Sequence, residues 1–372
     1  MTSTRELAKA IAIHSIGVVS PWGVGAAQTL STLRAGEARP AQLPPTGSKE
    51  PWPQAGAHWL PDFDARTHMG PKGVSYLNRM TQMAIIACAE ALRGGPSLDA
   101  DGKLQTGVVL GSRGGSMETI AEFVRSTYVG LPHMVSPMQF PNATMNGPAG
   151  QCAIWHSLGN VNGTVCAGDL TGLAALHYGS RMLRLGHAQG LLVGSVEDYG
   201  CFNAWAHQAR PSSPALPFTE AAVMFGLRAQ PDEGDPPAHL LGTRMRHLHA
   251  AGAGVEGLRQ GLRVEIEALL AGAGCPASDL AWAKVGRWAG EPATRAQTLA
   301  LGDVAPQVDE QFRHVEPLPA NAIGHAHGAA VSLDLAIALL MAPVGLGLLT
   351  AVGETGQIGA VLVRKNRAFG FH

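Results

Sequence analysis

Residues 163–176 of this chain read Gly163-Thr164-Val165-Cys166-Ala167-Gly168-Asp169-Leu170-Thr171-Gly172-Leu173-Ala174-Ala175-Leu176. The pattern predicts a short strand that runs directly into a helix over residues 170–184. Leu170, Leu173 and Leu176 recur at helical spacing, so one face of this helix is apolar. Asp169 stands where the helix begins, and a carboxylate there can accept hydrogen bonds from the first amide groups and meets the positive end of the helix dipole. The local pattern therefore predicts that Asp169 caps the helix.

Two glycines, Gly172 and Gly179, lie inside this predicted helix. Each weakens a helix by ~1 kcal/mol relative to alanine. Their presence predicts that a neighbouring backbone passes close to the helix at these positions.

The composition bounds the class of protein. The chain has 372 residues, 46% of them hydrophobic, which is enough for a large core. Its net charge is −1, and it has no long basic run, which argues against nucleic-acid binding. Its five cysteines are widely spaced and form no metal or disulfide pattern, which favours a reducing cytoplasm. Only 15% of residues are charged, which suggests that part of the surface is covered by another subunit.

No membrane segment or signal peptide is predicted. Residues 11–19 form a short apolar run that reads as a buried strand, and residues 335–349 are divided by Pro343 and glycines. Neither run approaches the roughly 18–20 uninterrupted apolar residues of a spanning helix.

Strand-like runs alternate with helical stretches rich in Ala and Leu, which predicts a layered α/β architecture. The predicted strands are 11–19, 107–111, 190–196, 280–285, 347–352 and 358–364. The predicted helices are 78–93, 117–124, 170–184, 255–273, 293–301 and 327–342. Residues 36–75 predict an irregular excursion. The break at residues 231–237, rich in proline and acidic residues, predicts two similar halves, 1–235 and 236–372, within one compact unit.

Six segments, in the right order, resemble β-ketoacyl-ACP synthases. After residues 163–176 come Arg181-Met182, Gly186 and Gly194-Ser195-Val196-Glu197, which fall on the frame of that family without a gap. The other matching segments are Ser20-Pro21-Trp22-Gly23, Gly107-Val108-Val109-Leu110-Gly111, Ser136-Pro137-Met138 with Pro141-Asn142, Pro217-Phe218 with Glu220, and Gly324-His325-Ala326-His327-Gly328-Ala329-Ala330. The resemblance implies a thiolase-like five-layered α/β/α/β/α fold, built from two pseudo-repeated halves. It also implies dimerisation through the strand near Asp169.

The chain departs from this family at its active-site positions. Members of the family use a nucleophilic cysteine, two histidines, a lysine and a gating phenylalanine. The corresponding positions here hold, in that order, Asp169, Arg287 (or its neighbour Gly286) and His325, then Ala320 and Glu354. Of the five, His325 alone matches the family.

These departures argue against synthase chemistry. A carboxylate that attacked a thioester would form a mixed anhydride, which is more reactive than the donor, whereas a thiolate is a far better nucleophile at neutral pH. An anionic Asp169 would also repel a developing enolate. The chain therefore resembles the degenerate chain-length-factor subunits of type II polyketide and aryl polyene systems, which pair with an active ketosynthase. The resemblance implies a heterodimer that shapes the acyl tunnel, with the acyl carrier protein docking mainly on the partner.

Two other functions remain open. The chain could be an atypical synthase, or a malonyl-ACP decarboxylase, that uses His325 with Asp169 or with Cys166, three residues earlier. It could also be a structural homodimer without acyl chemistry. We expect no cofactor and no metal: His325 and His327, like His247 and His249, have a spacing that does not direct both rings to one ion. Glu197 and Asp198 are neighbours on a strand and should face opposite sides.

Overall fold

The structure is a computed structural model of the chain. It describes residues 10–37, 39–44, 51–53, 55–95, 100–129, 133, 135–210, 216–229, 235–249, 254–287, 290–308 and 318–370. Within these ranges, no helix is both long enough and apolar enough to cross a membrane.

One large mixed sheet organises the molecule. Its strands follow the order β10-β11-β12-β9-β1-β8-β6-β4-β5, and β2 pairs with β1. The strands of this sheet are β1 (Ile11–Ser20), β2 (Gly23–Val24), β4 (Thr106–Gly111), β5 (Asn162–Val165), β6 (Gly190–Glu197), β8 (Ala221–Arg228), β9 (Ala238–His247), β10 (Leu280–Val285), β11 (Gly345–Val352) and β12 (Gln357–Lys365). A separate two-stranded sheet pairs β3 (Ala57–His58) with β7 (Phe218–Thr219).

The strand order repeats. In the first part of the chain the order is β4-β6-β8-β1, and in the second part it is β10-β11-β12-β9. Each series contains one parallel pair followed by two antiparallel pairs. Residues 11–13 of β1 pair with residues 238–240 of β9 and join the two series. The fold is therefore thiolase-like, as the resemblance implied, while the boundary at residues 235 and 236 stays a prediction.

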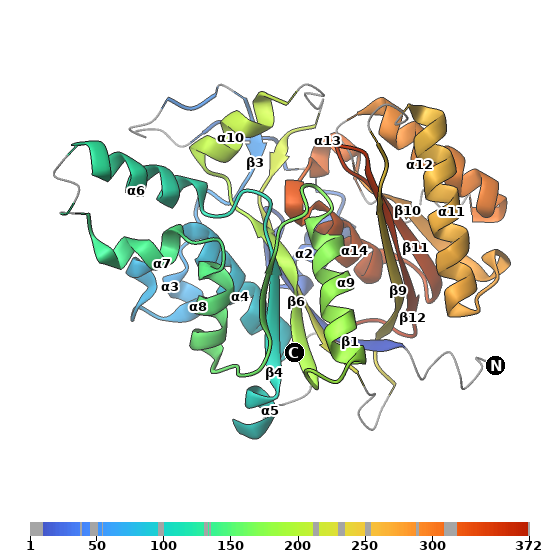
Figure 1. Ribbon diagram of the computed structural model, residues 1–372, viewed down its shortest axis with the longest axis horizontal. Coiled ribbons are helices and arrows are strands. Elements are labelled where there is room, and N and C mark those ends of the chain that lie inside the picture. Colours follow the sequence, from blue (N-terminus) through green and yellow to red (C-terminus); the bar gives the residue numbers. More distant parts are fainter. Residues whose placement is uncertain are drawn as a thin grey trace.

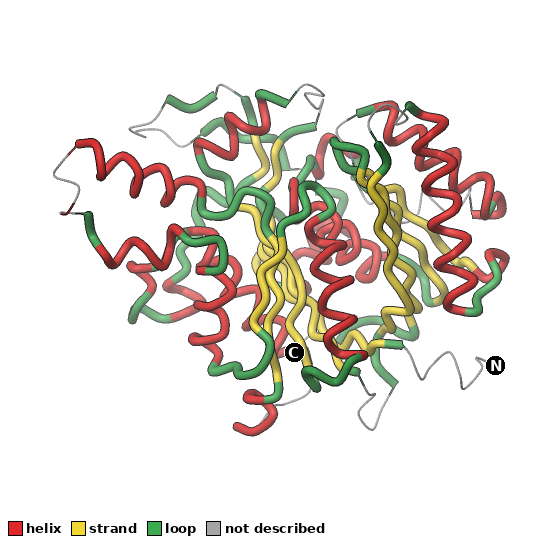
Figure 2. The backbone as a smooth tube through the Cα atoms, viewed as in Figure 1, coloured by secondary structure: helices red, strands yellow, loops and turns green. Residues whose placement is uncertain are grey.

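Helices form the other layers (Figures 1 and 2). The longer ones are α2 (Ala26–Arg34), α4 (Arg79–Arg93), α6 (Met117–Val129), α8 (Gly147–His156), α9 (Thr171–Arg184), α10 (Cys201–Gln208), α11 (Val255–Ala273), α12 (Glu291–Val304) and α14 (Ala330–Met341). The shorter ones are α3 (Arg66–Met69), α5 (Ala100–Leu104), α7 (Phe140–Ala143), α13 (Ala320–Ile323) and the 3₁₀ turns η1 (Val74–Tyr76), η3 (Pro137–Gln139), η5 (Ala277–Asp279), η6 (Pro306–Val308) and η8 (His327–Ala329).

Five layers follow one another across the molecule. Helices α4 and α8 cover one side of the first strand series, α9 and α14 lie between the two series, and α11 and α12 cover the far side of the second (Figure 1). Helix α14 is buried on nearly every side, because it packs between the two strand series and has no solvent face.

Most predicted elements are confirmed. The bounds of β10 and α11 are those predicted, and the helix predicted over 327–342 begins with the 3₁₀ turn η8 before it continues as α14. Strands β8 and β9 were not predicted. Strand β8 reads as a continuous apolar run because it is buried on both faces, and β9 ends in exposed charged residues.

The glycines of α9 mark close approaches, as predicted. A Cβ at Gly172 would lie 2.9 Å from the backbone nitrogen of Ser332 on α14. A Cβ at Gly179 would lie 2.6 Å from a methyl carbon of Val193, so there the neighbour is a side chain of β6 and not a backbone. Helix α9 can therefore sit against both α14 and the sheet.

Candidate functional site

Three loops bring together most of the predicted site residues. Asp169 follows β5, Arg287 follows β10, and His325 precedes η8. Asp169, Arg287 and His325 border a common cavity with Ala351 and residues of α14. The space inside is about 10 Å³, about enough for one water molecule. The cavity that these residues border therefore has no room for an acyl group.

Asp169 does not cap α9, so the sequence-based prediction is wrong. The N-cap residue of α9 is Leu170, which has no side-chain cap, and the hydroxyl of Thr171 accepts a hydrogen bond from the amide of Ala167 at 2.9 Å. The carboxylate of Asp169, which is 4% exposed, instead accepts hydrogen bonds from Arg210 Nη2 at 2.9 Å and from the amide of Glu354 at 3.2 Å. A full positive charge is a stronger partner for a buried carboxylate than the partial charges of a helix end.

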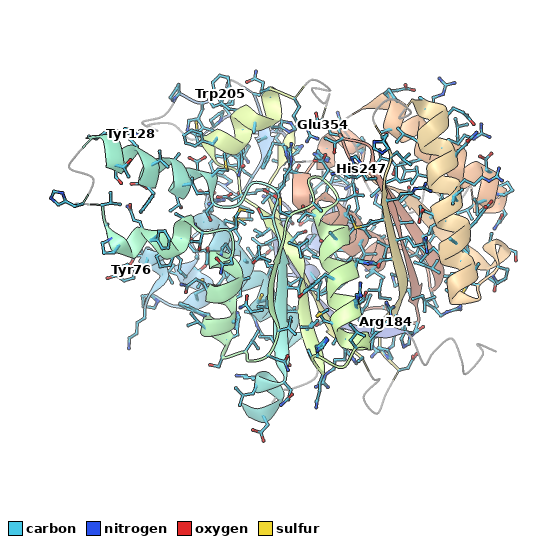
Figure 3. The ribbon with its side chains drawn as sticks, in the orientation of Figure 1. Tyr76, Tyr128, Arg184, Trp205, His247 and Glu354 are labelled. Atoms are coloured by element: carbon cyan, nitrogen blue, oxygen red, sulfur yellow. The ribbon has the colours of Figure 1, made fainter. Side chains whose placement is uncertain are left out.

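Arg210 links two carboxylates, one of which, Asp169, borders the cavity. Its side chain is 2% exposed, and its Nε donates to Glu354 Oε2 at 3.1 Å while its Nη2 bonds Asp169. Arg113 Nη2 lies 3.7 Å from the same oxygen of Glu354. Glu354 lies between β11 and β12 (Figure 3). We call Asp169, Arg210, Glu354 and Arg113 the ion-pair cluster.

A chain of hydrogen bonds continues from the ion-pair cluster into the core. His207 Nε2 lies 3.1 Å from the carbonyl oxygen of Leu216, which can only accept, so His207 donates there and its Nδ1 is an acceptor when the ring is neutral. His327 Nε2, 2.7 Å away, then donates to that Nδ1. His327 Nδ1 in turn accepts from Arg113 Nη1 at 2.5 Å. The arrangement fixes both tautomers.

Burial keeps these rings neutral. Burial lowers the pKa of His207 to about 4, although its bond to Leu216 opposes the shift. Burial and then His325 lower the pKa of His327 well below the usual range, and burial and then Arg210 do the same for His325. His325, 1% exposed, accepts a long hydrogen bond (3.4 Å) at Nδ1 from the amide of His327. A neutral His325 can donate a hydrogen bond, but it carries no charge with which to stabilise an enolate.

Arg287 is fixed by an acidic residue of the central helix layer. Its amide donates to Asp334 Oδ2 at 2.9 Å, and its guanidinium also bonds Asp334. Lys284 Nζ lies 3.7 Å from the same carboxylate. Ala320, at the start of α13, is exposed and does not border the cavity. The structure therefore groups Asp169, Arg287, His325 and, through Arg210, Glu354, and leaves Ala320 apart.

Glu197 and Asp198 have different surroundings, as predicted from their adjacent places at the end of β6. Glu197 accepts from the amide of Arg113 and from Ser112 Oγ, whereas Asp198 accepts from Asn203. Burial raises the pKa of Glu197 to about 8 and that of Asp198 to about 7. The two carboxyl groups therefore have different hydrogen-bond donors, and repulsion from Asp198 adds to the raised pKa of Glu197, as repulsion from Glu220 and Glu118 does for Asp198.

Cys166 is exposed, and its thiol lies 3.5 Å from the carbonyl oxygen of Arg113, outside the residues that border the cavity. Among the described residues no group of three His, Cys, Asp or Glu side chains could hold a metal ion. Arg210, Arg113 and His207 were not predicted. No local pattern marks them, because Arg210 reaches Asp169 across 41 residues of sequence and the fold alone brings them together.

The fold defines a protein of the ketosynthase type, and Asp169 is the residue that the resemblance places at the nucleophile position. The model of the family "Beta-ketoacyl synthase, N-terminal domain" matches residues 8–218, more than half of the chain. The chain belongs to the β-ketoacyl synthase family.

Curated relatives agree with this assignment. The chain is 25% identical over 365 residues to 3-oxoacyl-[acyl-carrier-protein] synthase 2 of Rhizobium meliloti, which covers 87% of this chain and 84% of the relative. It is 27% identical over 351 residues to the putative polyketide beta-ketoacyl synthase 2 of Streptomyces halstedii, and the match covers 88% of this chain and 84% of the relative.

Solved structures share the whole fold. The structure described as "The ishigamide ketosynthase/chain length factor" superposes with a TM-score of 0.84 at 29% identity, covering 96% of this chain and 99% of that one. A second similar structure is the complex described as "AntDE:AntF (apo): type II PKS acyl-carrier protein in complex with its ketosynthase bound to the hexaketide". It gives a TM-score of 0.74 at 12% identity over 96% of this chain and 99% of that one, and it supports the fold alone.

Proposed function

We propose that this chain is a non-catalytic ketosynthase-like subunit, a chain length factor, that pairs with an active β-ketoacyl synthase. One observation carries the proposal. The buried Asp169 occupies the nucleophile position, its Oδ2 accepts a hydrogen bond from Arg210 Nη2 at 2.9 Å, and it borders a cavity of about 10 Å³. Such a space has no room for an acyl group. A carboxylate that is already ion-paired is also a weaker nucleophile than a free one, because the guanidinium withdraws its charge.

The partner would bind at the edge of the sheet, through strand β5. This strand ends the strand order and has one hydrogen-bonded neighbour, β4, among the described residues. Helices α8 and α9 pack beside it and expose Ile154 (73%) and Tyr178 (40%). An unpaired edge together with exposed apolar side chains is what a second subunit would cover. The structure of an ishigamide ketosynthase/chain length factor, similar to this chain over 96% of its length, supports a subunit of this kind.

In this arrangement the acyl carrier protein docks mainly on the partner, which holds the thiol and both histidines. The present subunit completes the wall of the acyl tunnel and helps to set product length. The pathway would be of polyketide, aryl polyene or fatty-acid type, in the cytoplasm. Polyketide synthases among the relatives favour the first of these.

The interface is tested by co-expressing the chain with an intact ketosynthase and measuring the dissociation constant of the heterodimer. Ile154→Arg places a charge in the proposed contact and should weaken the heterodimer at least about tenfold, since burying an unpaired charge costs several kcal/mol. Val264→Arg, on α11 and 49% exposed, is the matched control and should leave it unchanged. Equal affinities for both variants, or a stable homodimer that excludes the ketosynthase, would contradict the proposed partner.

The catalytic part of the proposal is tested on the same complex. Replacing the cysteine of the partner should abolish condensation, whereas Cys166→Ser in this chain should leave the rate within about twofold. Carbon dioxide release from a malonyl carrier protein by this chain alone, lost in the Cys166→Ser variant, would favour the alternative of an atypical decarboxylase.

A further inference from the structure

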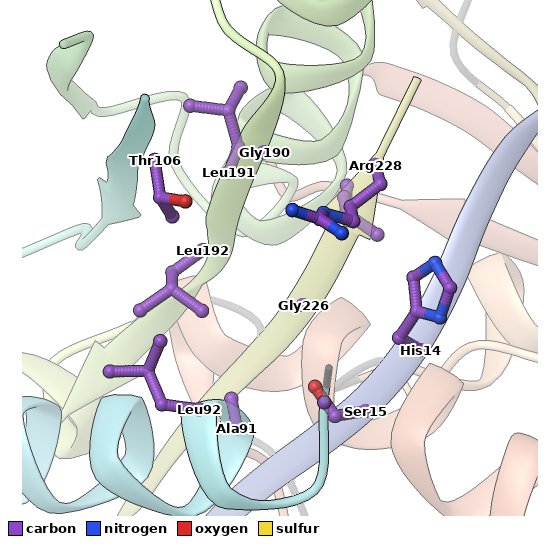
Figure 4. Close-up of a pocket in the computed structure, with 12 residues that line it drawn as sticks. His14, Ser15, Ala91, Leu92, Thr106, Gly190, Leu191, Leu192, Gly226 and Arg228 are labelled. Atoms are coloured by element: carbon purple, nitrogen blue, oxygen red, sulfur yellow. The ribbon is translucent and has the colours of Figure 1, made fainter. Parts of the chain in front are cut away.

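A groove lies at the far end of helix α14, away from the ion-pair cluster. Its volume is about 440 Å³, within the range of small-molecule sites in proteins. Ala330, the first residue of α14, borders the small cavity beside Asp169, whereas Leu340, in the last turn, borders this groove. The helix rises about 15 Å between these two residues, so the two sites are distinct. The hollow beside Arg228 holds about 30 Å³, room for about two water molecules, and is too small for an organic ligand (Figure 4).

One face of helix α2 forms the long wall of the groove. The residues of α2 that border it are Ala27, Leu30, Ser31 and Arg34. Their spacing of i, i+3, i+4 and i+7 places them on one face of the helix over about 10 Å. Ala27 lies at the end near the helix N-terminus, and Arg34 lies at the other end. The wall therefore changes along its length from apolar to cationic.

The rest of the groove is apolar. Leu340 of α14 and, near the C-terminal end of the chain, Ala368 and Phe369 complete its border. Leu340 is 5% exposed and Phe369 is 8% exposed, so packing in the core holds both in place. Ala27 and Ala368 are exposed, and an apolar group bound in the groove would remove their surface from water.

Positive charge gathers at the end of the groove near Arg34. Among the described residues that border the groove, Arg34 is the one with a charge, and no described carboxylate is paired with it. Lys365, which is 5% exposed, lies close by, and burial and then repulsion from Arg34 lower its pKa to about 8. Its Nζ donates to the carbonyl oxygen of Ala342 at 2.6 Å, and it too has no carboxylate partner among the described residues. Two neighbouring cations without a carboxylate favour an anion.

The carbonyl ends of two helices oppose an anion at this place. Arg34 is the last residue of α2, and Ala342 is the C-cap residue of α14. Each helix end carries roughly half a negative charge, so the two ends together do not outweigh the two whole positive charges. Glu37, the acidic residue nearest to Arg34 in sequence, is exposed and does not border the groove. The net field therefore attracts an anion.

We propose that this groove binds a medium-chain monocarboxylate of about eight carbons, with octanoate as the model ligand. The carboxylate lies on the guanidinium of Arg34, which matches its two oxygens, and accepts a hydrogen bond from Ser31 Oγ. The hydrocarbon chain runs along α2 toward Ala27. An extended chain of eight carbons spans about 9 Å, close to the length of this wall. The groove has space for about fourteen water molecules, which is more than the ten heavy atoms of octanoate need.

The site does not depend on whether the chain is catalytic or on which partner it has. The test is a titration of the full-length chain with sodium octanoate at constant ionic strength, followed by saturation-transfer NMR. We expect a dissociation constant of about 1 mM, because ten atoms contribute and the groove is open on one side. Octanamide, of the same shape without charge, should bind at least about fivefold more weakly. Butanoate, which lacks four methylene groups, should bind at least about tenfold more weakly.

Two variants test the two ends of the groove. Arg34→Gln should bind octanoate at least about fivefold more weakly, whereas Arg34→Lys keeps the charge and should retain most of the affinity. Arg295→Gln removes an exposed charge on α12 and is the matched control, so it should bind as the wild type does. Ala27→Trp fills the apolar end and should weaken binding at least about tenfold, whereas Ala271→Trp, at an exposed position of α11, should not.

Thermal unfolding of each variant without ligand shows that it is folded. The proposal is overturned by the absence of saturation transfer to the wild type at about 10 mM octanoate. It is equally overturned by equal binding of octanamide, or by equal affinities of Arg34→Gln and Arg295→Gln. Self-association of the chain that Arg34→Gln and Ala27→Trp abolish would assign the groove to a second copy of this chain and would also overturn it.

Discussion

Removing Arg210 should destabilise the chain more than any exposed charge change. In Arg210→Met the carboxylate of Asp169 stays buried with the amide of Glu354 as its one remaining hydrogen-bond donor, since Asp169 Oδ1 has no partner among the described residues. Leaving one member of a buried ion pair uncompensated costs about 3–5 kcal/mol of the free energy of unfolding. Urea denaturation followed by circular dichroism measures this loss.

The double variant Asp169→Leu with Arg210→Met tests the cause. Replacing both members of a buried pair by apolar residues is often neutral, so the double variant should recover most of the loss. Arg246→Met is the control, because Arg246 is 54% exposed and lies 3.9 Å from Glu265, and it should cost at most about 1 kcal/mol. A loss below about 1 kcal/mol in Arg210→Met, or a double variant no more stable than that single one, would refute the reasoning.

Two further predictions concern stability. Burial raises the pKa of Glu197 from 4.5 to about 8, so the folded state keeps a proton that the unfolded state releases, and stability falls as pH rises through that interval. In urea titrations from pH 5 to 8, the free energy of unfolding should fall less steeply with pH for Glu197→Gln than for the wild type, by up to about 1.4 kcal/mol per pH unit. Equal slopes for the two proteins would contradict the raised pKa of Glu197. Gly172→Ala should cost about 1–3 kcal/mol, because its Cβ would lie 2.9 Å from the amide nitrogen of Ser332. Gly272→Ala on α11, where no atom lies within 4 Å, should instead stabilise by about 0.5–1 kcal/mol, and a loss equal to that of Gly172→Ala would rule out crowding as the cause.

Much of the fold could be predicted from the sequence where an element has one apolar face. Helix α11 has such a face and was placed with its observed bounds. Strand β10 was also placed with its observed bounds, although most of it is buried on both faces. Strand β8 is buried on both faces and shows no alternation, but β4 and β6 are buried in the same way and were predicted as continuous apolar runs. Burial on both faces therefore does not explain why β8 was missed.

The family frame named residues of which most lie together and one, Ala320, lies apart, but it could not predict their interactions. The family frame placed Asp169, Arg287, His325 and Glu354, and the structure brings three of them to one cavity and links Glu354 to it through Arg210. The helix cap assigned to Asp169 was wrong, because that inference considered only residues near it in sequence. Arg210 is a partner that the tertiary fold brings to Asp169, and no pattern in the neighbouring sequence indicates it.

The absence of covalent chemistry on this chain is tested most directly by intact-protein mass spectrometry. The complex with an active ketosynthase is incubated with an acyl carrier protein that carries an acyl group, and both subunits are weighed. We expect an acyl adduct on the partner and an unchanged mass for this 38.7 kDa chain. A stable acyl adduct on this chain, on Asp169 or on Cys166, would contradict it.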